Sequence, residues 1–414
     1  MIMHDAPAEP SGTAVSSKVS LPLVIAICFL VMMGEGFDTQ AIGVAAPQMM
    51  PELGISPALK GAIFGIGQWG VAIGALAGGY LADRWDRRRA LFASVLLFGG
   101  TTLAMAYAWD YSSLMALRLV AGLGLGAAIP SVVATAIDLS PPGKRVGTVA
   151  TIMAGLPLGG ALAAAVAATV MHDVGWRIIF YIGGALPLIA LLALPMLPVR
   201  KGRSVTAAQQ TKPTFSMIFV HGSRAFTLTM WLVYFITLLM VYLLLLWLPT
   251  MMVDQGVPEP KADLLSMMFN LAAVAGNIIL GRTTDKFGYK RVVPAIYFCL
   301  IAATAIVAFA ESYAAYVVGF ALLGFLLLGG QNCLNGILPS FYPPQARSIS
   351  VGSAVGVGRI GSIVGPLYAG IAFAAGHGVP VVLRSMVGLT IVAALAIAVA
   401  LRIGRVRTGT EGSP

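Results

Sequence analysis

Two stretches of the sequence carry the same charged pattern: Gly79-Tyr80-Leu81-Ala82-Asp83-Arg84-Trp85-Asp86-Arg87-Arg88-Arg89 and Gly281-Arg282-Thr283-Thr284-Asp285-Lys286-Phe287-Gly288-Tyr289-Lys290-Arg291. A glycine, an aspartate, a basic residue and a basic pair occupy equivalent positions 202 residues apart, in a chain of 414 residues. The separation is close to half of the chain, which indicates two related halves. Internal repeats in an apolar chain are typical of transporters whose halves move against each other.

The composition places the chain in a membrane. Hydrophobic residues make up 58% of it and charged residues 10%, against about 25% charged in soluble domains. Apolar stretches of about 20 residues, the length needed to cross a bilayer, recur throughout. We predict an all-α membrane protein with twelve transmembrane helices. They span residues 21–46, 57–82, 89–109, 112–137, 146–172, 175–197, 224–251, 260–284, 289–311, 312–339, 346–375 and 379–403.

The repeat and one polar stretch divide these spans into two groups of six. We expect a cytoplasmic tail at 1–20, a six-helix bundle at 21–197, a cytoplasmic linker at 198–223, a second bundle at 224–403 and a tail at 404–414. The linker is the one segment long and polar enough to join two bundles. The sequence offers no place for a soluble domain.

The net charge of +10 reflects the orientation of the chain in the membrane. With the N-terminus inside, most Lys and Arg residues fall on segments of the cytoplasmic side, as the positive-inside rule requires. Both termini are then cytoplasmic. The basic charge therefore does not indicate a nucleic-acid partner.

The cysteines and histidines form no pattern that suggests a metal or a cofactor. Three cysteines fall inside spans, where a thiol serves as a small apolar side chain. The four histidines, His4, His172, His221 and His377, fall in the tail or near span ends, and we expect them at the surface. No nucleophile–base set points to an enzyme.

Four ionisable residues lie inside predicted spans, where each is costly and hence a functional candidate. These four stand out among the ionisable residues of the spans: Glu35 and Asp38 share one face of the first helix, Arg118 lies early in the fourth, and Arg359 lies within the eleventh. They could form ion pairs that only hold helices together. Alternatively, the carboxylates carry protons and an arginine anchors an anionic substrate, because a guanidinium binds a carboxylate through two hydrogen bonds. The spacing of these residues does not show which arginine acts on the carboxylates and which one anchors the substrate.

Charged residues at the cytoplasmic span ends suggest a gate. An acid at a helix end can hold helix termini and basic side chains together when that face is closed, whereas membrane orientation alone requires no aspartate. The predicted gating residues are Asp83, Arg84, Arg88, Asp138, Asp285, Lys286 and Arg347.

Further polar and aromatic residues within spans are candidates for contacts with substrate. Amides are available at Asn277, Gln331 and Asn335, and aromatic rings at Phe37 and Tyr234. A ring can stack on a flat substrate. Aromatic residues also collect at membrane interfaces, so an interfacial position of these rings is the alternative interpretation.

The charged turn and its second copy resemble the major facilitator superfamily over nearly the whole chain. Glu35-Gly36-Phe37-Asp38-Thr39-Gln40-Ala41, and the segment around Arg359, are similar to its aromatic acid:proton symporters. The resemblance implies the superfamily's two pseudo-symmetric bundles and uptake of an aromatic carboxylate, such as a hydroxyphenylpropionate or a hydroxybenzoate, with protons. It also implies functional positions at Asp38, Arg118, Asp138, Arg347 and Arg359.

Two positions depart from the pattern. Asp86 replaces the usual glycine of the first turn, and Ser131 stands where the family often has asparagine. We expect a monomer in the inner membrane of a bacterium, with the lipid bilayer as its surroundings and the proton as its coupling ion. An efflux antiporter of amphipathic compounds, or a membrane sensor of aromatic acids that does not transport them, are the alternatives.

Overall fold

The computed structural model describes residues 21–84, 87–140, 145–196, 218–219, 224–343 and 346–404, and those residues are overwhelmingly helical. The first half comprises α1 (Leu21–Glu52), α2 (Pro57–Arg84), α3 (Arg87–Met105), α4 (Tyr111–Leu139), α5 (Arg145–Met153), α6 (Gly155–Val166), η1 (Ala167–Met171), α7 (His172–Val174), α8 (Arg177–Ala193) and η2 (Leu194–Met196). The second comprises α9 (Arg224–Asp254), α10 (Glu259–Phe287), α11 (Tyr289–Ala308), α12 (Tyr313–Ile337), η4 (Leu338–Phe341), α13 (Arg347–Ala374) and α14 (Val379–Ile403).

Each predicted span corresponds to one helix or to one continuous series of helices. Eleven of the spans in the described residues are long and apolar enough to cross a membrane. The remaining one is α3, whose first turn holds Arg87, Arg88 and Arg89. Large apolar side chains point outward, such as Leu76, which is 81% exposed. The chain is therefore a multi-pass helical membrane protein, as predicted.

Two predicted spans differ in detail from the structure. The first was expected to end at residue 46, but α1 continues through Pro47 to Glu52. The fifth is divided between Met153 and Gly155 into α5 and α6. Pro157 accounts for this division, because proline has no N–H to bond the carbonyl four residues earlier and its ring crowds that carbonyl.

A side-chain cap fixes the start of α4, and a glycine fixes the turn between α10 and α11. Asp110 caps α4, since its carboxylate accepts from the Ser113 backbone N–H at 2.8 Å. Gly288, in the second charged turn, has φ +80° and separates α10 from α11, a backbone geometry that glycine adopts readily. Asp86, which replaces glycine in the first turn, lies outside the described residues.

The two halves repeat the same close helix contacts. A Cβ atom on Gly36 of α1 would lie 1.8 Å from the carbonyl oxygen of Leu156 on α6, and one on Gly361 of α13 would lie 2.2 Å from that of Phe235 on α9. These are the first and fifth spans of one half, and equivalent spans of the other. The pairs α2–α4 and α10–α12 also meet at glycines. Small residues let backbones approach where apolar side chains gain little by leaving lipid, so both halves form the predicted pseudo-symmetric bundles.

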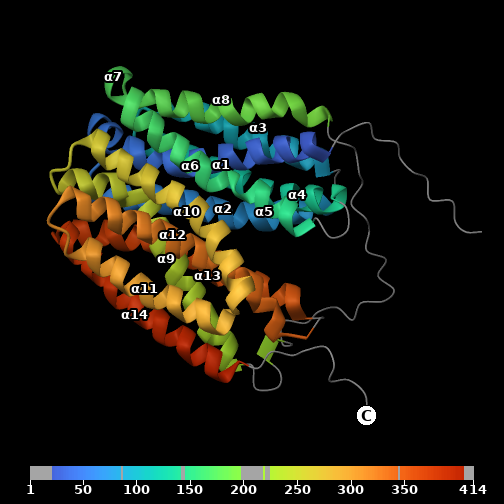
Figure 1. Ribbon diagram of the computed structural model, residues 1–414. Helices are drawn as coiled ribbons and strands as arrows, with labels where there is room; N and C mark the ends of the chain where they lie inside the picture. The colour runs from blue at the N-terminus through green and yellow to red at the C-terminus, as the bar shows by residue number, and fades with distance from the viewer. Residues whose placement is uncertain are drawn as a thin grey trace, which may run out of the picture.

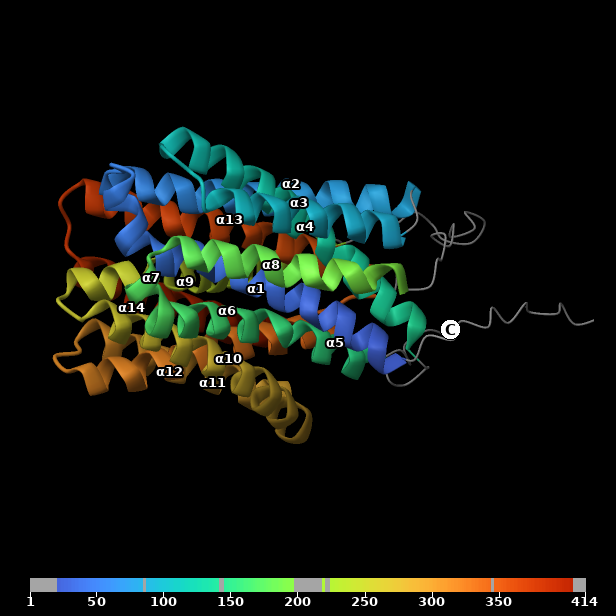
Figure 2. The same ribbon diagram turned by 90° about the horizontal axis from the view of Figure 1, so that it is seen from above.

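The two bundles contact each other mainly at one end of the molecule. We call the end where α1 begins the Leu21 end and the opposite one the Glu52 end. The helix pairs α1–α9, α2–α13 and α6–α10 join the halves, and Figure 2 shows α2 beside α13. Near the Glu52 end, a Cβ atom on Gly61 of α2 would lie 3.0 Å from Cα of Gly370 on α13. Toward the Leu21 end the bundles diverge (Figure 1).

Candidate functional site

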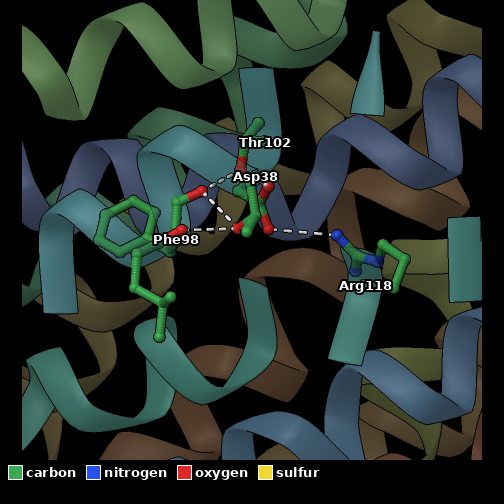
Figure 3. A network of polar contacts seen from close by, with 6 residues as sticks. Asp38, Phe98, Thr102 and Arg118 are labelled. Atoms are coloured by element: carbon green, nitrogen blue, oxygen red, sulfur yellow. Dashed lines mark hydrogen bonds and ion pairs between the residues drawn. The ribbon is translucent and has the colours of Figure 1, made fainter. Parts of the chain in front are cut away.

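Asp38 lies at the centre of a polar network inside the first half (Figure 3). Its side chain is fully buried, and its Oδ2 atom is 3.1 Å from Nη1 of Arg118 on α4. Its Oδ1 atom accepts a hydrogen bond from the Thr102 hydroxyl of α3 at 2.5 Å. The same hydroxyl is 2.7 Å from the Phe98 carbonyl oxygen. Three helices thus hold one carboxylate.

A glycine of α2 makes room for the guanidinium of Arg118. A Cβ atom on Gly67 would lie 3.0 Å from Nη2 and 3.2 Å from Nε. Arg118 is 2% exposed, and its Nε atom has no hydrogen-bond partner in the described residues. The ion pair with Asp38 is therefore the main compensation for burying this charge.

Glu35 and Arg359 form a second charged group, near the boundary between the halves. Glu35 is buried one helical turn before Asp38, and its Oε2 atom accepts no hydrogen bond among the described residues. Its carboxylate interacts electrostatically with Arg359 of α13. Arg359 donates from Nη1 to the Tyr242 hydroxyl of α9 at 2.9 Å. Arg118 is thus paired with a carboxylate, whereas the hydrogen bond of Arg359 goes to a neutral hydroxyl.

Three of the predicted amide and aromatic residues come together in the second half. The Tyr234 hydroxyl of α9 donates to Oδ1 of Asn335 on α12 at 2.9 Å, and Nε2 of Gln331 is 3.4 Å from the same oxygen. Among the described residues, the buried Oε1 atom of Gln331 has no hydrogen-bond partner, and neither has Oδ1 of Asn277 on α10. These oxygens are hydrogen-bond acceptors available to a donor.

Phe37 does not join this amide group. Its ring is fully buried inside the first half, where a Cβ atom on Gly183 of α8 would lie 2.9 Å from it. Although Phe37 is adjacent to Asp38 in sequence, neighbouring helical residues point about 100° apart. In this arrangement its ring packs between helices.

The predicted gating residues lie at the Leu21 end. Arg88 donates to the Pro195 carbonyl oxygen at 3.0 Å, and Arg347 donates to that of Tyr342 at 3.3 Å, each within its own half. Asp285 and Lys286 are exposed. The side chains of Asp83, Arg84 and Asp138 lie outside what the structure describes. The gate therefore stays a prediction.

The amide groups of Gln40 and Asn270 join the halves midway along the helices. Nε2 of Gln40 on α1 donates to the Leu245 carbonyl oxygen of α9 at 3.0 Å. Nδ2 of Asn270 on α10 donates to Oε1 of Gln40 at 3.1 Å. Gln40 lies about half a turn beyond Asp38, and it was not selected from the sequence because it carries no charge.

His172 also joins the halves, contrary to its predicted place at the surface. At the Glu52 end its Nδ1 atom is 3.3 Å from Oε2 of Glu259, and its Nε2 atom is 3.5 Å from Oδ2 of Asp263, both on α10. Gln48 of α1 donates to the same Glu259 oxygen at 2.9 Å. His172 is only 22% exposed, because α10 covers it.

Comparisons with known proteins agree with this architecture. A sequence profile described as Major Facilitator Superfamily matches residues 28–260 and 230–413. The 3-(3-hydroxy-phenyl)propionate transporter of Escherichia coli (strain K12) is 37% identical over 385 residues, covering 93% of this chain and 95% of that protein. The gallate transporter of Pseudomonas putida is 31% identical, covering 91% and 90%.

Among solved structures, a bacterial homolog of the human lysosomal transporter Spinster, in an inward-facing and unoccupied conformation, has a TM-score of 0.76. It is 18% identical, with 94% of this chain and 98% of that one covered, so it supports the fold alone. With the repeated charged turns, the paired bundles and these relatives, the chain belongs to the major facilitator superfamily, and within it to the aromatic acid:H⁺ symporter group.

Proposed function

We propose that the chain is a secondary active transporter that takes up an aromatic carboxylate together with protons by alternating access. The observation that carries the proposal is the different pairing of two arginines within the helices, the buried Arg118 and the half-buried Arg359. Arg118 is bound to Asp38, whereas Arg359 is bound to a hydroxyl and has a carboxylate of the other half only at longer range. Arg359 therefore suits a substrate carboxylate, and Asp38 suits a proton.

The amide group of the second half fits the remainder of such a substrate. The relatives described above transport molecules that combine a carboxylate with a hydroxylated ring. A ring hydroxyl can donate to the oxygens of Gln331 and Asn277 that have no partner in the described part of the chain. The proposed ligand is thus held by Arg359 at its carboxylate and by amides at its ring, with ring substituents setting the specificity.

Proton coupling follows from the Asp38–Arg118 pair. When Asp38 is ionised, the pair fixes α1 against α4. When Asp38 takes up a proton, the carboxyl becomes neutral and the guanidinium of Arg118 loses its counter-charge. The resulting change in charge at the centre of the first half biases the relative position of the bundles. A substrate carboxylate bound to Arg359 removes the electrostatic interaction of that arginine with Glu35. Substrate binding and protonation are thereby coupled.

We further propose that both termini are cytoplasmic, in the inner membrane of a bacterium, and that the protein acts as a monomer. On this assignment the Leu21 end faces the cytoplasm. The observed arrangement, joined at the Glu52 end, is then closed to the outside and corresponds to an inward-facing conformation.

Reconstituted protein tests the proposal. Labelled 3-(3-hydroxyphenyl)propionate should accumulate in liposomes under an inward proton gradient, and an uncoupler should abolish the accumulation. Asp38→Asn should prevent accumulation against a gradient, whereas Arg359→Lys should weaken substrate binding, since lysine cannot bind a carboxylate bidentately. Normal accumulation by Asp38→Asn would remove the proton role. Outward transport of amphipathic compounds would favour an efflux antiporter, and binding without transport would favour a sensor.

A further inference from the structure

The hydroxyl of Thr102 has more acceptors than it can serve. It lies 2.5 Å from Oδ1 of Asp38 and 2.7 Å from the carbonyl oxygen of Phe98, as Figure 3 shows. A threonine hydroxyl has one hydrogen to donate and two lone pairs to accept. It can therefore donate fully to only one of the two oxygens at a time.

The two choices correspond to the two protonation states of Asp38. When the carboxylate is ionised, Thr102 donates to Oδ1. When Oδ1 carries a proton, Asp38 becomes the donor, Thr102 accepts, and the threonine hydrogen turns to the Phe98 carbonyl oxygen. The proton that arrives stays on Asp38, and Thr102 keeps its own hydrogen. The Thr102 hydroxyl and Oδ1 of Asp38 thus remain hydrogen-bonded to each other in both states, which matters because Asp38 is fully buried.

The repeat provides an internal comparison. Thr304 of α11 stands 202 positions after Thr102, the offset of the charged turns, and Met240 stands 202 positions after Asp38. Without a carboxylate at that position, the Thr304 hydroxyl lies 3.0 Å from the Leu300 carbonyl oxygen, four residues earlier, and 3.1 Å from the Thr390 hydroxyl. A threonine hydroxyl at this position can thus donate to the carbonyl oxygen four residues earlier when no ionised carboxylate accepts its hydrogen.

We infer that Thr102 is a positioning residue whose hydroxyl exchanges the roles of donor and acceptor with Asp38, and thereby holds this carboxyl group in place in both the ionised and the protonated state. The inference rests on the proposed role of Asp38 as proton carrier. Other charged groups act on Asp38 as well: Arg118 of α4 pairs with it, Glu35 lies on its own helix, and Arg359 acts through Glu35.

The same helix offers a matched control. Thr101 donates to the Leu97 carbonyl oxygen at 2.7 Å and lies 3.1 Å from that of Phe98, without any contact to a carboxylate in the described residues. Thr101→Val therefore removes a hydroxyl of the same kind, at the next position, from a site where no proton is exchanged. Thr102→Ser keeps the hydroxyl, Thr102→Val keeps the shape, and Thr102→Ala removes both without risk of a clash.

The test is the pH dependence of proton-driven uptake of labelled 3-(3-hydroxyphenyl)propionate by reconstituted protein. A hydrogen bond to a charged acceptor contributes more than one between neutral groups. Loss of the hydroxyl therefore disfavours ionised Asp38 more than protonated Asp38. We expect the pH at which uptake falls to half its maximum to move upward by about one unit in Thr102→Val and Thr102→Ala. It should stay in place in Thr102→Ser and Thr101→Val.

The outcomes separate this inference from the function on which it rests. If Thr102→Val and Thr102→Ala keep the pH profile of the unmodified protein while Asp38→Asn abolishes accumulation, Thr102 only fills space and the inference is wrong. If Asp38→Asn itself accumulates substrate with an unchanged pH profile, the proton role of Asp38 fails first. An upward shift in Thr101→Val as large as that in Thr102→Val would also overturn the inference.

Discussion

The buried pair of Asp38 and Arg118 should show strong energetic coupling. Asp38→Asn leaves the guanidinium of Arg118 buried without a counter-charge, and Arg118→Met leaves the Asp38 carboxylate with the Thr102 hydrogen bond but no counter-charge. The partners are 2% and 0% exposed, so neither charge can be hydrated without a rearrangement. Breaking a buried pair on one side costs about 3–5 kcal/mol. The double variant buries no charge, and it should be no less stable than either single variant.

A double-mutant cycle measures this coupling as a free energy. With single losses of about 3 kcal/mol or more and a double loss no larger, the coupling energy is at least about 3 kcal/mol. Unfolding free energies in bicelles by steric trapping are the suitable readout, because thermal scans of detergent-solubilised protein are irreversible.

The same chain contains a control for this cycle. Glu52 and Arg177 are paired at 2.8 Å but are 48% and 43% exposed, so their coupling should stay below about 1 kcal/mol. Additive losses of unfolding free energy at Asp38 and Arg118 would refute the reasoning that burial makes this coupling strong. Equal coupling energies in the buried and the exposed pair would refute it as well.

Three further predictions address packing, closure and specificity. Gly36→Ala should strongly reduce the yield of folded protein, because the new Cβ would meet a backbone oxygen at 1.8 Å. Gly100→Ala meets nothing within 4 Å and should be tolerated, and size-exclusion profiles compare the two variants. His172→Ala removes two contacts between the halves and should widen spin-label distances at the Glu52 end, whereas His377→Ala, in an exposed loop, should not. Within the described residues, Tyr234→Phe leaves Oδ1 of Asn335 with only the 3.4 Å contact from Gln331 and should change the relative uptake of hydroxylated and unhydroxylated benzoates. Unchanged ratios would exclude the Tyr234 hydroxyl from ring recognition.

The sequence predicted the fold well because the relevant signals are local and repeated. The charged turns revealed two halves, and runs of apolar residues fixed the spans to within a few positions. The extension of α1 to Glu52 was missed because Pro47 is an ordinary reason to end a helix. Inside a bundle, neighbouring helices and local adjustments satisfy the freed backbone groups, so the helix continues.

The candidate site was predicted only in part, because its partners come from different helices. Charge marked Asp38, Arg118 and Arg359 as costly at membrane depth, but spacing could not show that Arg118 is the arginine paired with Asp38. Thr102 carries no charge, and its one sequence signal is its offset from Thr304. His172 was misread because its burial depends on a helix of the other half.

The two ends of the molecule use different chemistry for closure, and that difference bears on how the halves move. At the Glu52 end and midway along the helices, three hydrogen bonds of Gln40, Asn270 and Gln48 cross between the halves in the described residues, and His172 lies beside Glu259 and Asp263. At about 1 kcal/mol each, the three hydrogen bonds contribute about 3 kcal/mol to the closed arrangement. A transporter that populates both conformations needs a comparable stabilisation from the contacts that form when the opposite end closes. The reason is that conformers of one protein differ by only a few kcal/mol. The repeated charged turns lie at that opposite end, so their aspartates and basic residues are well placed to supply it. One proton taken up with a monoanion moves no net charge, so it provides about 1.4 kcal/mol per pH unit and gains nothing from the voltage. On the proposed coupling, protonation of Asp38 can therefore shift the balance only between two ends that are nearly matched.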